Sequence, residues 1–178
     1  MTLGPLKVGI AGYGVVGKRR HHYIAQNPHF AVVAVCDQKV DRLEGATGIA
    51  KFRMPDELLE QDLDALFVCL SNDVAAGVTI AGLDKGLHVF CEKPPGRSMA
   101  DVEIVRRKSR QYPEQKLKYG FNHRYHDSVK EALKIVQGGS LGKVINLRGV
   151  YGKSAIINFE SEWRTKREYA GGGILLDQ

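Results

Sequence analysis

The chain carries the motif Gly12-Tyr13-Gly14-Val15-Val16-Gly17 between an apolar run at Lys7–Ala11 and a segment, Val15–Gln26, whose spacing fits a helix. Asp37 directly follows the next apolar run, Ala31–Cys36, and stands 20 residues after Gly17. A strand, a G-x-G-x-x-G turn, a helix and an acid at this distance form the dinucleotide-binding arrangement. The sequence therefore predicts a dinucleotide site at this turn. The alternative is a plain turn between strand and helix.

Each glycine of the motif has its own physical role in such a site. Gly12 permits the tight turn, Gly14 lets the backbone approach a pyrophosphate, and Gly17 allows close packing of the helix on the strand. Val15 and Val16 belong to the first helical turn, whose N–H groups and partial positive charge attract phosphates.

Asp37 bears on the choice of cofactor. Its carboxylate is expected to accept hydrogen bonds from the adenosine ribose hydroxyls and to repel a 2′-phosphate. We therefore expect NAD rather than NADP as the cofactor. Lys39 and Arg42 lie just beyond Asp37 and are expected to soften this preference.

The rest of the first 122 residues alternates apolar runs with amphipathic segments, which predicts an α/β fold with a doubly wound parallel sheet of the Rossmann type. Further strands are expected at Ala65–Leu70, Leu87–Cys91 and Lys116–Phe121. Further helices are expected at Pro55–Gln61, Asp73–Lys85 and from Ser98 to about Gln111, with Asp101 completing a capping box. We assign residues 1–122 to an NAD(P)-binding domain.

The pattern changes after this boundary. An amphipathic helix is expected at Asp127–Gln137 and an alternating strand of the antiparallel type at Lys143–Tyr151. Residues 123–178 are therefore expected to form the start of an α+β substrate domain with an open antiparallel sheet. The unpaired edges of that strand would favour self-association.

Composition narrows the range of partners. The 178 residues carry a net charge of +6, spread evenly so that residues 1–120 and 121–178 each have an excess of three positive charges. We expect a small anionic ligand rather than nucleic acid, and no membrane span or signal peptide. Cys36, Cys69 and Cys91 lie in or beside apolar runs, which favours buried, reduced thiols in a cytoplasmic protein and no metal site.

A second polar cluster, Glu92-Lys93-Pro94-Pro95, follows the predicted strand Leu87–Cys91. Ligands of open parallel sheets lie at the carboxyl ends of the strands, so Glu92 and Lys93 are expected beside the cofactor. A lysine there can exchange a proton with a substrate hydroxyl. The alternative is a solvated surface lysine in a turn that two prolines hold rigid.

The motifs together resemble the Gfo/Idh/MocA family of NAD(P)-dependent sugar and polyol oxidoreductases, which includes the glucose-fructose oxidoreductase and inositol dehydrogenase types. The resemblance spans residues 6–178. Besides the glycine motif and Glu92-Lys93-Pro94, it rests on Gly120-Phe121-Asn122-His123-Arg124, Leu141-Gly142-Lys143-Val144, Trp163-Arg164 and Gly171-Gly172-Gly173-Ile174-Leu175-Leu176-Asp177.

The resemblance implies roles for several residues. Lys93 matches the family's active-site lysine, and Asp177 matches the acid that opens its D-x-G-x-H segment. Asn72 matches an asparagine near the nicotinamide ribose. Residues implied to contact substrate are Asn122, Arg124, Trp163 and Arg164, although a packing role for Trp163 stays open. The resemblance also implies a cis Lys93–Pro94 bond and a homo-oligomeric full-length protein.

The chain departs from the family pattern in two places. Ala75 stands where the family often has a histidine, and the family's catalytic histidine would fall four residues beyond Asp177, past Gln178. We therefore expect a C-terminally truncated chain that binds dinucleotide without turning it over. The parent activity is expected to be hydride transfer between nicotinamide and a hydroxyl of a sugar, sugar nucleotide or polyol. The alternatives are an NAD-sensing regulator and a lyase or glycosidase that recycles its NAD.

Overall fold

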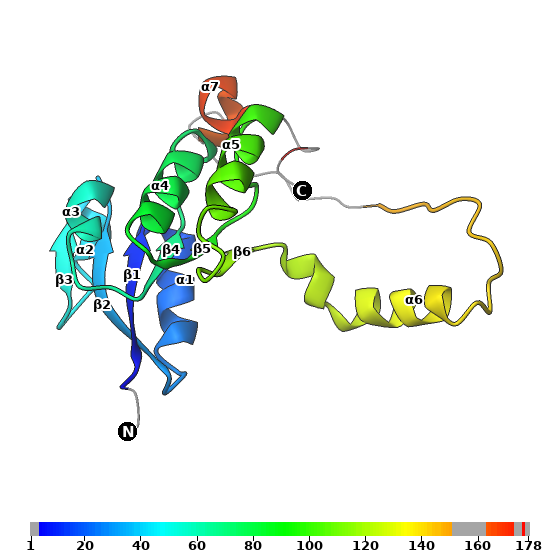
Figure 1. The fold of residues 1–178 in the computed structure, drawn as a ribbon, viewed down its shortest axis with the longest axis horizontal. Helices are drawn as coiled ribbons and strands as arrows, with labels where there is room; N and C mark the ends of the chain where they lie inside the picture. Colours follow the sequence, from blue (N-terminus) through cyan, green and yellow to red (C-terminus); the bar gives the residue numbers. More distant parts are fainter. Residues whose placement is uncertain (1–3, 151–162, 173–175, 177–178) are drawn as a thin grey trace. The chain divides into compact units, whose positions relative to one another are not determined.

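The computed structural model describes residues 4–150, 163–172 and 176 (Figure 1). The chain forms two compact units. The first contains residues 1–120 together with 163–178, and the second contains residues 121–162. Among the residues that the structure describes, no helix combines the length and apolar character needed to cross a bilayer.

A six-stranded sheet forms the centre of the first unit, and every neighbouring pair of strands is parallel. Its strands are β1 (Leu6–Ala11), β2 (Phe30–Cys36), β3 (Ala50–Phe52), β4 (Ala65–Val68), β5 (His88–Cys91) and β6 (Leu117–Tyr119). The order across the sheet is β3-β2-β1-β4-β5-β6. The chain thus reverses its direction of travel between β1 and β4, and ligands of open α/β sheets bind at such a switch point. The predicted doubly wound parallel sheet is confirmed.

The helices of this unit are α1 (Val15–Ile24), α2 (Val40–Leu43), α3 (Pro55–Leu59), α4 (Asn72–Asp84), α5 (Met99–Ser109) and α7 (Arg167–Ala170), with a 3-10 turn at Trp163–Thr165. The predicted capping box of α5 is present, because the Asp101 N–H donates to Ser98 Oγ and the Ser98 N–H donates to Asp101 Oδ2. Helix α2 and strand β3 were not predicted from the sequence. Both are very short, and β3 owes its extended form to pairing with β2 at the edge of the sheet.

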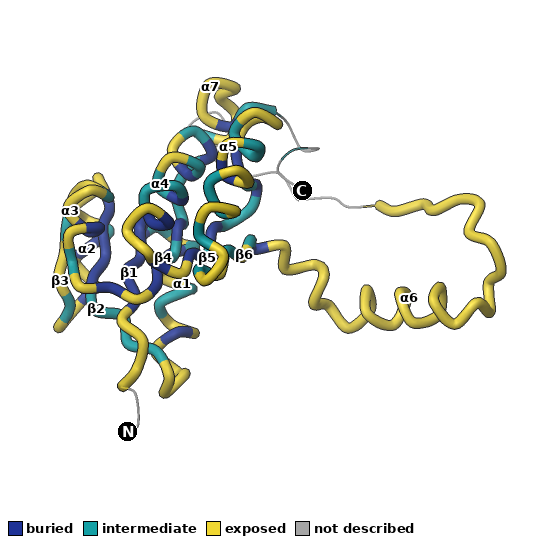
Figure 2. Tube along the Cα trace, viewed as in Figure 1, coloured by how far each residue is buried: buried dark blue, intermediate teal, exposed yellow. Residues whose placement is uncertain are grey.

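Two hydrophobic clusters cover the two faces of the sheet. One gathers Leu58 of α3 and Leu83 of α4 against Leu66 of β4. The other gathers Ile24 of α1 with Val8 of β1. Side chains alternate between the faces along each strand, so a strand buried on both sides needs an unbroken apolar run. Figure 2 shows this burial concentrated along the sheet. Cys36 and Cys91 are buried as expected, and burial raises the pKa of each thiol to about 11, whereas Cys69 is only partly buried.

Residues 121–150 present a different picture. A 3-10 turn at Asn122–Tyr125 precedes α6 (Asp127–Gln137), which confirms the predicted helix. All of residues 121–150 are exposed (Figure 2). The exposed residues include the apolar Val129, Leu133, Ile135 and Val136 of α6. The predicted strand Lys143–Tyr151 is wrong over residues 143–150, which are irregular, and Tyr151 lies outside the described residues. A strand needs a neighbour to pair its backbone groups. None of the described residues pairs with this segment.

Candidate cofactor-binding site

The loop between β1 and α1 has two positions that only glycine can occupy. Gly12 has a φ of +89°, and a Cβ atom there would lie 2.4 Å from the carbonyl oxygen of Cys69. A Cβ atom on Gly17 would lie 2.0 Å from the carbonyl oxygen of Gly12. At Gly12 the loop lies directly against the residue that follows β4. At Gly17 the first turn of α1 lies directly against the loop. Both glycines are therefore required by the fold itself.

Gly14 differs, because no protein backbone crowds it. The nearest atom to a Cβ built there is the Nη1 atom of Arg42, at 3.4 Å, and its φ is −74°. Gly14 is the N-cap of α1, no side chain caps the helix, and its first turn contains no acidic residue. Val15, next in the chain, is 77% exposed. The open approach and uncapped N–H groups of this ten-residue helix fit a pyrophosphate.

Asp37 lies beside this loop and is 7% exposed. The N–H of Tyr13 donates to its Oδ2 atom at 2.9 Å, and the N–H of Lys39 donates to its Oδ1 atom at 2.9 Å. Arg42 of α2 completes the set with an ion pair at 3.2 Å. The structure thus joins the glycine motif to the acid that the sequence placed 20 residues later.

Tyr13 links the loop to α1 through a contact that was not predicted from the sequence. Its side chain is 4% exposed, and its hydroxyl lies 2.5 Å from Nδ1 of His21 on α1. Burial raises the pKa of Tyr13 and lowers the pKa of His21. Tyr13 is part of the glycine motif, but nothing in the sequence indicated that its hydroxyl would contact His21, eight residues later.

At the end of β5, Glu92 is engaged by Arg20 of α1. The Nη2 and Nε atoms of Arg20 lie 2.5 and 2.6 Å from Oε1 of Glu92, and the guanidinium stacks over Phe90 at 4.9 Å. Gly120 leaves room for this carboxylate, because a Cβ there would lie 2.7 Å from Oε2 of Glu92. The ion pair ties α1 to the strand end that carries Lys93. The predicted cis Lys93–Pro94 bond is confirmed, and Lys93 is half-buried.

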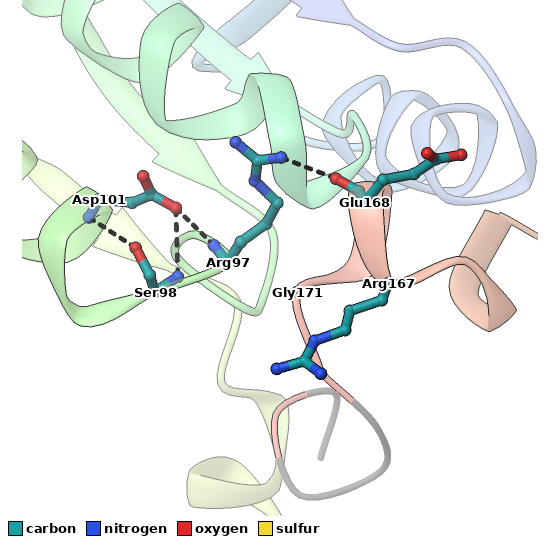
Figure 3. Close-up of a pocket in the computed structure, with 6 residues that line it drawn as sticks. All are labelled: Arg97, Ser98, Asp101, Arg167, Glu168 and Gly171. Atoms are coloured by element: carbon teal, nitrogen blue, oxygen red, sulfur yellow. Dashed lines mark hydrogen bonds between the residues drawn. The ribbon is translucent and has the colours of Figure 1, made fainter.

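Asn72, at the start of α4, is buried and donates through Nδ2 to the carbonyl oxygen of Ala170 at 3.0 Å. Arg97 makes a parallel contact, because its Nη1 atom donates to the carbonyl oxygen of Glu168 at 2.7 Å (Figure 3). Gly171 has a φ of +79°, and a Cβ there would meet Cβ of Arg97 at 2.5 Å. The side chain of Asn72 therefore holds the end of α7 against the start of α4 within the first unit.

A hollow of about 300 Å³ lies where α7 meets the start of α5 (Figure 3). Its lining residues are Arg97, Ser98, Asp101, Arg167, Glu168 and Gly171. Asp101 already satisfies the N–H groups of Arg97 and Ser98. The hollow thus lies between two packed helices. None of the residues that line it belongs to the glycine loop.

The remaining predicted residues are placed as follows. Trp163 and Arg164 form a pair in which the guanidinium lies 4.5 Å from the indole ring. Asn122 and Arg124 are exposed and belong to the second unit. Asp177 lies outside the described residues. The structure brings together Gly12, Gly14, Gly17 and Asp37 as one site.

Comparison with known proteins agrees with this geometry. Residues 6–120 match the family model GFO_IDH_MocA, described as an oxidoreductase family with an NAD-binding Rossmann fold. The chain belongs to this oxidoreductase family. The matched residues contain the whole sheet and the glycine loop, so the family assignment rests on the part of the chain that builds the site.

Several relatives are inositol or glucoside dehydrogenases. The chain is 30% identical to myo-inositol 2-dehydrogenase of Thermotoga maritima over 80% of this chain and 44% of that protein. It is 29% identical to D-glucoside 3-dehydrogenase of Escherichia coli over 99% of this chain and 52% of that protein. A crystal structure of scyllo-inositol dehydrogenase from Lactobacillus casei with bound NAD(H) and scyllo-inositol matches with a TM-score of 0.73 at 28% identity, over 78% of this chain and 42% of that one. The chain spans about half the length of the curated relatives that it matches.

Proposed function

We propose that the chain is the cofactor-binding part of an NAD-dependent dehydrogenase that oxidises a secondary hydroxyl of a sugar, sugar nucleotide or polyol. The observation that carries the proposal is the uncapped N-terminus of α1 behind Gly14, with the buried carboxylate of Asp37 beside it. One end of this arrangement suits a pyrophosphate and the other suits a ribose.

The residues of the site would have separate roles in binding the dinucleotide and in moving the proton. The N–H groups of Val15, Val16 and Gly17 would hold the pyrophosphate, and Asp37 would accept hydrogen bonds from the adenosine ribose. When bound, the nicotinamide supplies a hydride acceptor at C4. Lys93, which follows β5 directly after the Arg20–Glu92 pair, would hold or move the proton of the substrate hydroxyl at Nζ.

The substrate class and the remaining site residues come from the relatives and the sequence resemblance. The named relatives act on myo-inositol, a D-glucoside and scyllo-inositol, which share ring carbons bearing secondary hydroxyls. We assign substrate contacts to Asn122, Arg124, Trp163 and Arg164, a cofactor contact to Asn72, and a catalytic role to Asp177. Inactivity of residues 1–178 alone, a cytoplasmic location and a homo-oligomeric parent are parts of the same proposal.

The test is a calorimetric titration of residues 1–178 with NAD and with NADP, followed by an assay of NADH formation on a panel of inositols, glucosides and sugar nucleotides. The proposal predicts saturable NAD binding and weaker NADP binding. The proposal also predicts no NADH formation by residues 1–178 alone. Net NADH formation would exclude a sensor and an enzyme that recycles NAD, but it would contradict the proposed inactivity of this chain, and absence of dinucleotide binding would overturn the proposal.

A further inference from the structure

Arg20 of α1 reaches across to the end of β5 and contacts Glu92. Both of its contacts, from Nη2 at 2.5 Å and from Nε at 2.6 Å, fall on the same carboxylate oxygen, Oε1. Its guanidinium lies over the ring of Phe90, and that ring stacks on Phe67 at 4.9 Å. Phe67 packs against the apolar cluster that contains Ile24 of α1, so the guanidinium lies on the sheet face that α1 covers. One side chain thus connects the helix of the glycine loop to the residue after β5.

The Arg20–Glu92 pair is largely shielded from water. The side chain of Arg20 is 22% exposed and that of Glu92 is 14% exposed. A shielded ion pair adds little net stability compared with apolar side chains of the same size, because both charges lose their hydration. A contribution to stability alone therefore does not account for a charged pair at this position. What the pair does supply is a fixed direction for the Glu92 carboxylate.

The pair lies in the half of the sheet over which the second nucleoside of a dinucleotide would extend. The glycine loop follows β1 and Asp37 follows β2, so the adenosine half would lie over these two strands. A dinucleotide that crosses the switch point between β1 and β4 continues over the carboxyl ends of β4 and β5. Glu92 is the first residue after β5, and its N–H donates at 2.9 Å to the carbonyl oxygen of Val68 at the end of β4. Its carboxylate is thus placed where the nicotinamide half would contact the protein.

We propose that Arg20 is a positioning residue for the nicotinamide half of the dinucleotide. It holds Glu92, and with it the turn formed by Glu92 and Lys93, in the orientation that this half contacts. The proposal rests on the dinucleotide-binding function proposed above. Because Arg20 belongs to the helix whose N-terminus would bind the pyrophosphate, it also fixes the end of β5 relative to the pyrophosphate site.

Arg19 provides a matched control on the same helix. It is the preceding residue, carries the same charge and is exposed. Arg19→Met therefore removes one positive charge from α1 and leaves the contact between Arg20 and Glu92 in place. A second variant separates positioning from stability. Arg20→Met combined with Glu92→Gln removes both charges, so no unpaired carboxylate remains in the shielded site.

The experiment titrates each variant of residues 1–178 with NAD and with ADP, which carries the adenosine and diphosphate without the nicotinamide riboside. The measured quantity is the ratio of dissociation constants, Kd for ADP over Kd for NAD. Comparing this ratio between variants cancels the difference in charge between the two ligands. We expect Arg20→Met to lower the ratio about fivefold or more through weaker NAD binding, and Arg19→Met to keep the wild-type ratio. The double variant should recover the stability lost in Arg20→Met and retain the lowered ratio.

The possible results distinguish the role of Arg20 from the function of the site. A fall smaller than about fivefold in Arg20→Met, or an equal fall in Arg19→Met, overturns the role of Arg20 while the dinucleotide site stands. Recovery of both the ratio and the stability in the double variant also overturns it, because the pair would then act through stability alone. Failure of the wild-type chain to bind NAD overturns the proposed function as well. If circular dichroism shows that Arg20→Met is unfolded, the double variant decides by the same ratio.

Discussion

The sheet of residues 4–120 and the segment of residues 121–150 come from similar amphipathic sequence but reach opposite states of burial. The first encloses Ile10, Leu66 and Val89 at 0–2% exposure between two layers of helices. The second has Leu133 at 53% and Ile145 at 94% exposure. An apolar pattern thus specifies a helix in both regions, but among the residues that the structure describes, only the first region has partners packed on its apolar faces.

The difference bears directly on where the chemistry resides. The glycine loop, Asp37 and the Arg20–Glu92 pair all belong to the region with its own core, which can hold their geometry fixed. A substitution in the first region is therefore expected to have a larger effect than a similar substitution in the second.

The largest contrast is expected for leucine truncation. Leu66→Ala removes a fully buried side chain from β4 and is expected to lower the free energy of unfolding by about 2–5 kcal/mol. Leu133→Ala on α6 should change it by less than about 0.5 kcal/mol, because the side chain is already exposed. Urea denaturation followed by circular dichroism measures both. Equal losses in the two variants would mean that α6 is packed in solution.

Glycine substitution gives the next contrast. Gly17→Ala places a methyl group against the Gly12 carbonyl and is expected to cost about 1–3 kcal/mol of unfolding free energy. Gly149→Ala, where a Cβ would have no neighbour within 4 Å, should stay within about 0.5 kcal/mol of the wild type. Thermal melts of the two variants provide the measurement, and a stable Gly17→Ala variant would contradict the tight contact between α1 and the loop.

Ion pairs are also expected to contribute more to the free energy of unfolding in the first region than in the second. Arg20→Met leaves the mostly buried carboxylate of Glu92 without its main partner and is expected to cost about 1–3 kcal/mol. Lys130→Met breaks an exposed pair with Asp127 on α6 and should have no measurable effect. A double-mutant cycle with Glu92→Gln isolates the first pair. A coupling energy near zero would show that Arg20 does not hold Glu92.

The smallest effect concerns pH. Burial lowers the pKa of His21, so the folded state prefers the neutral ring beside Tyr13. The resulting stability is present above pH 6.5 and is lost as the pH falls through the lowered pKa. The melting temperature should therefore drop between pH 6.5 and 5 more in the wild type than in His21→Asn. Identical pH profiles would show that this histidine is not buried in its neutral form.

The sequence alone predicted the features that depend on residues close together in the chain. Gly12 and Gly17 were predictable because a left-handed turn and a close helix contact leave few alternatives, and Ser98 with Asp101 was predictable because a capping box spans three residues. The parallel sheet followed from unbroken apolar runs such as that of β4.

Other features depend on chain segments far apart in sequence. The contacts Arg20–Glu92 and Asn72–Ala170 join residues 72 and 98 positions apart, and no local pattern announces them. The strand predicted at Lys143–Tyr151 is wrong over its described residues for a related reason. Alternating apolar and polar residues can form an apolar face, but they do not provide a second strand to pair with. For Asn72 the resemblance implied a cofactor contact, and no local pattern predicted that its amide also donates to the carbonyl oxygen of Ala170.

Amide hydrogen exchange of residues 1–178, with and without NAD, tests the central claim most directly, because it observes the site and both regions together. Without NAD, amides of β1, β4 and β5 should exchange slowly and those of α6 quickly. With NAD, added protection should appear in peptides covering residues 12–18 and 37–42 and be absent from residues 127–137. Binding without protection at residues 12–18, or protection confined to α6, would contradict the account.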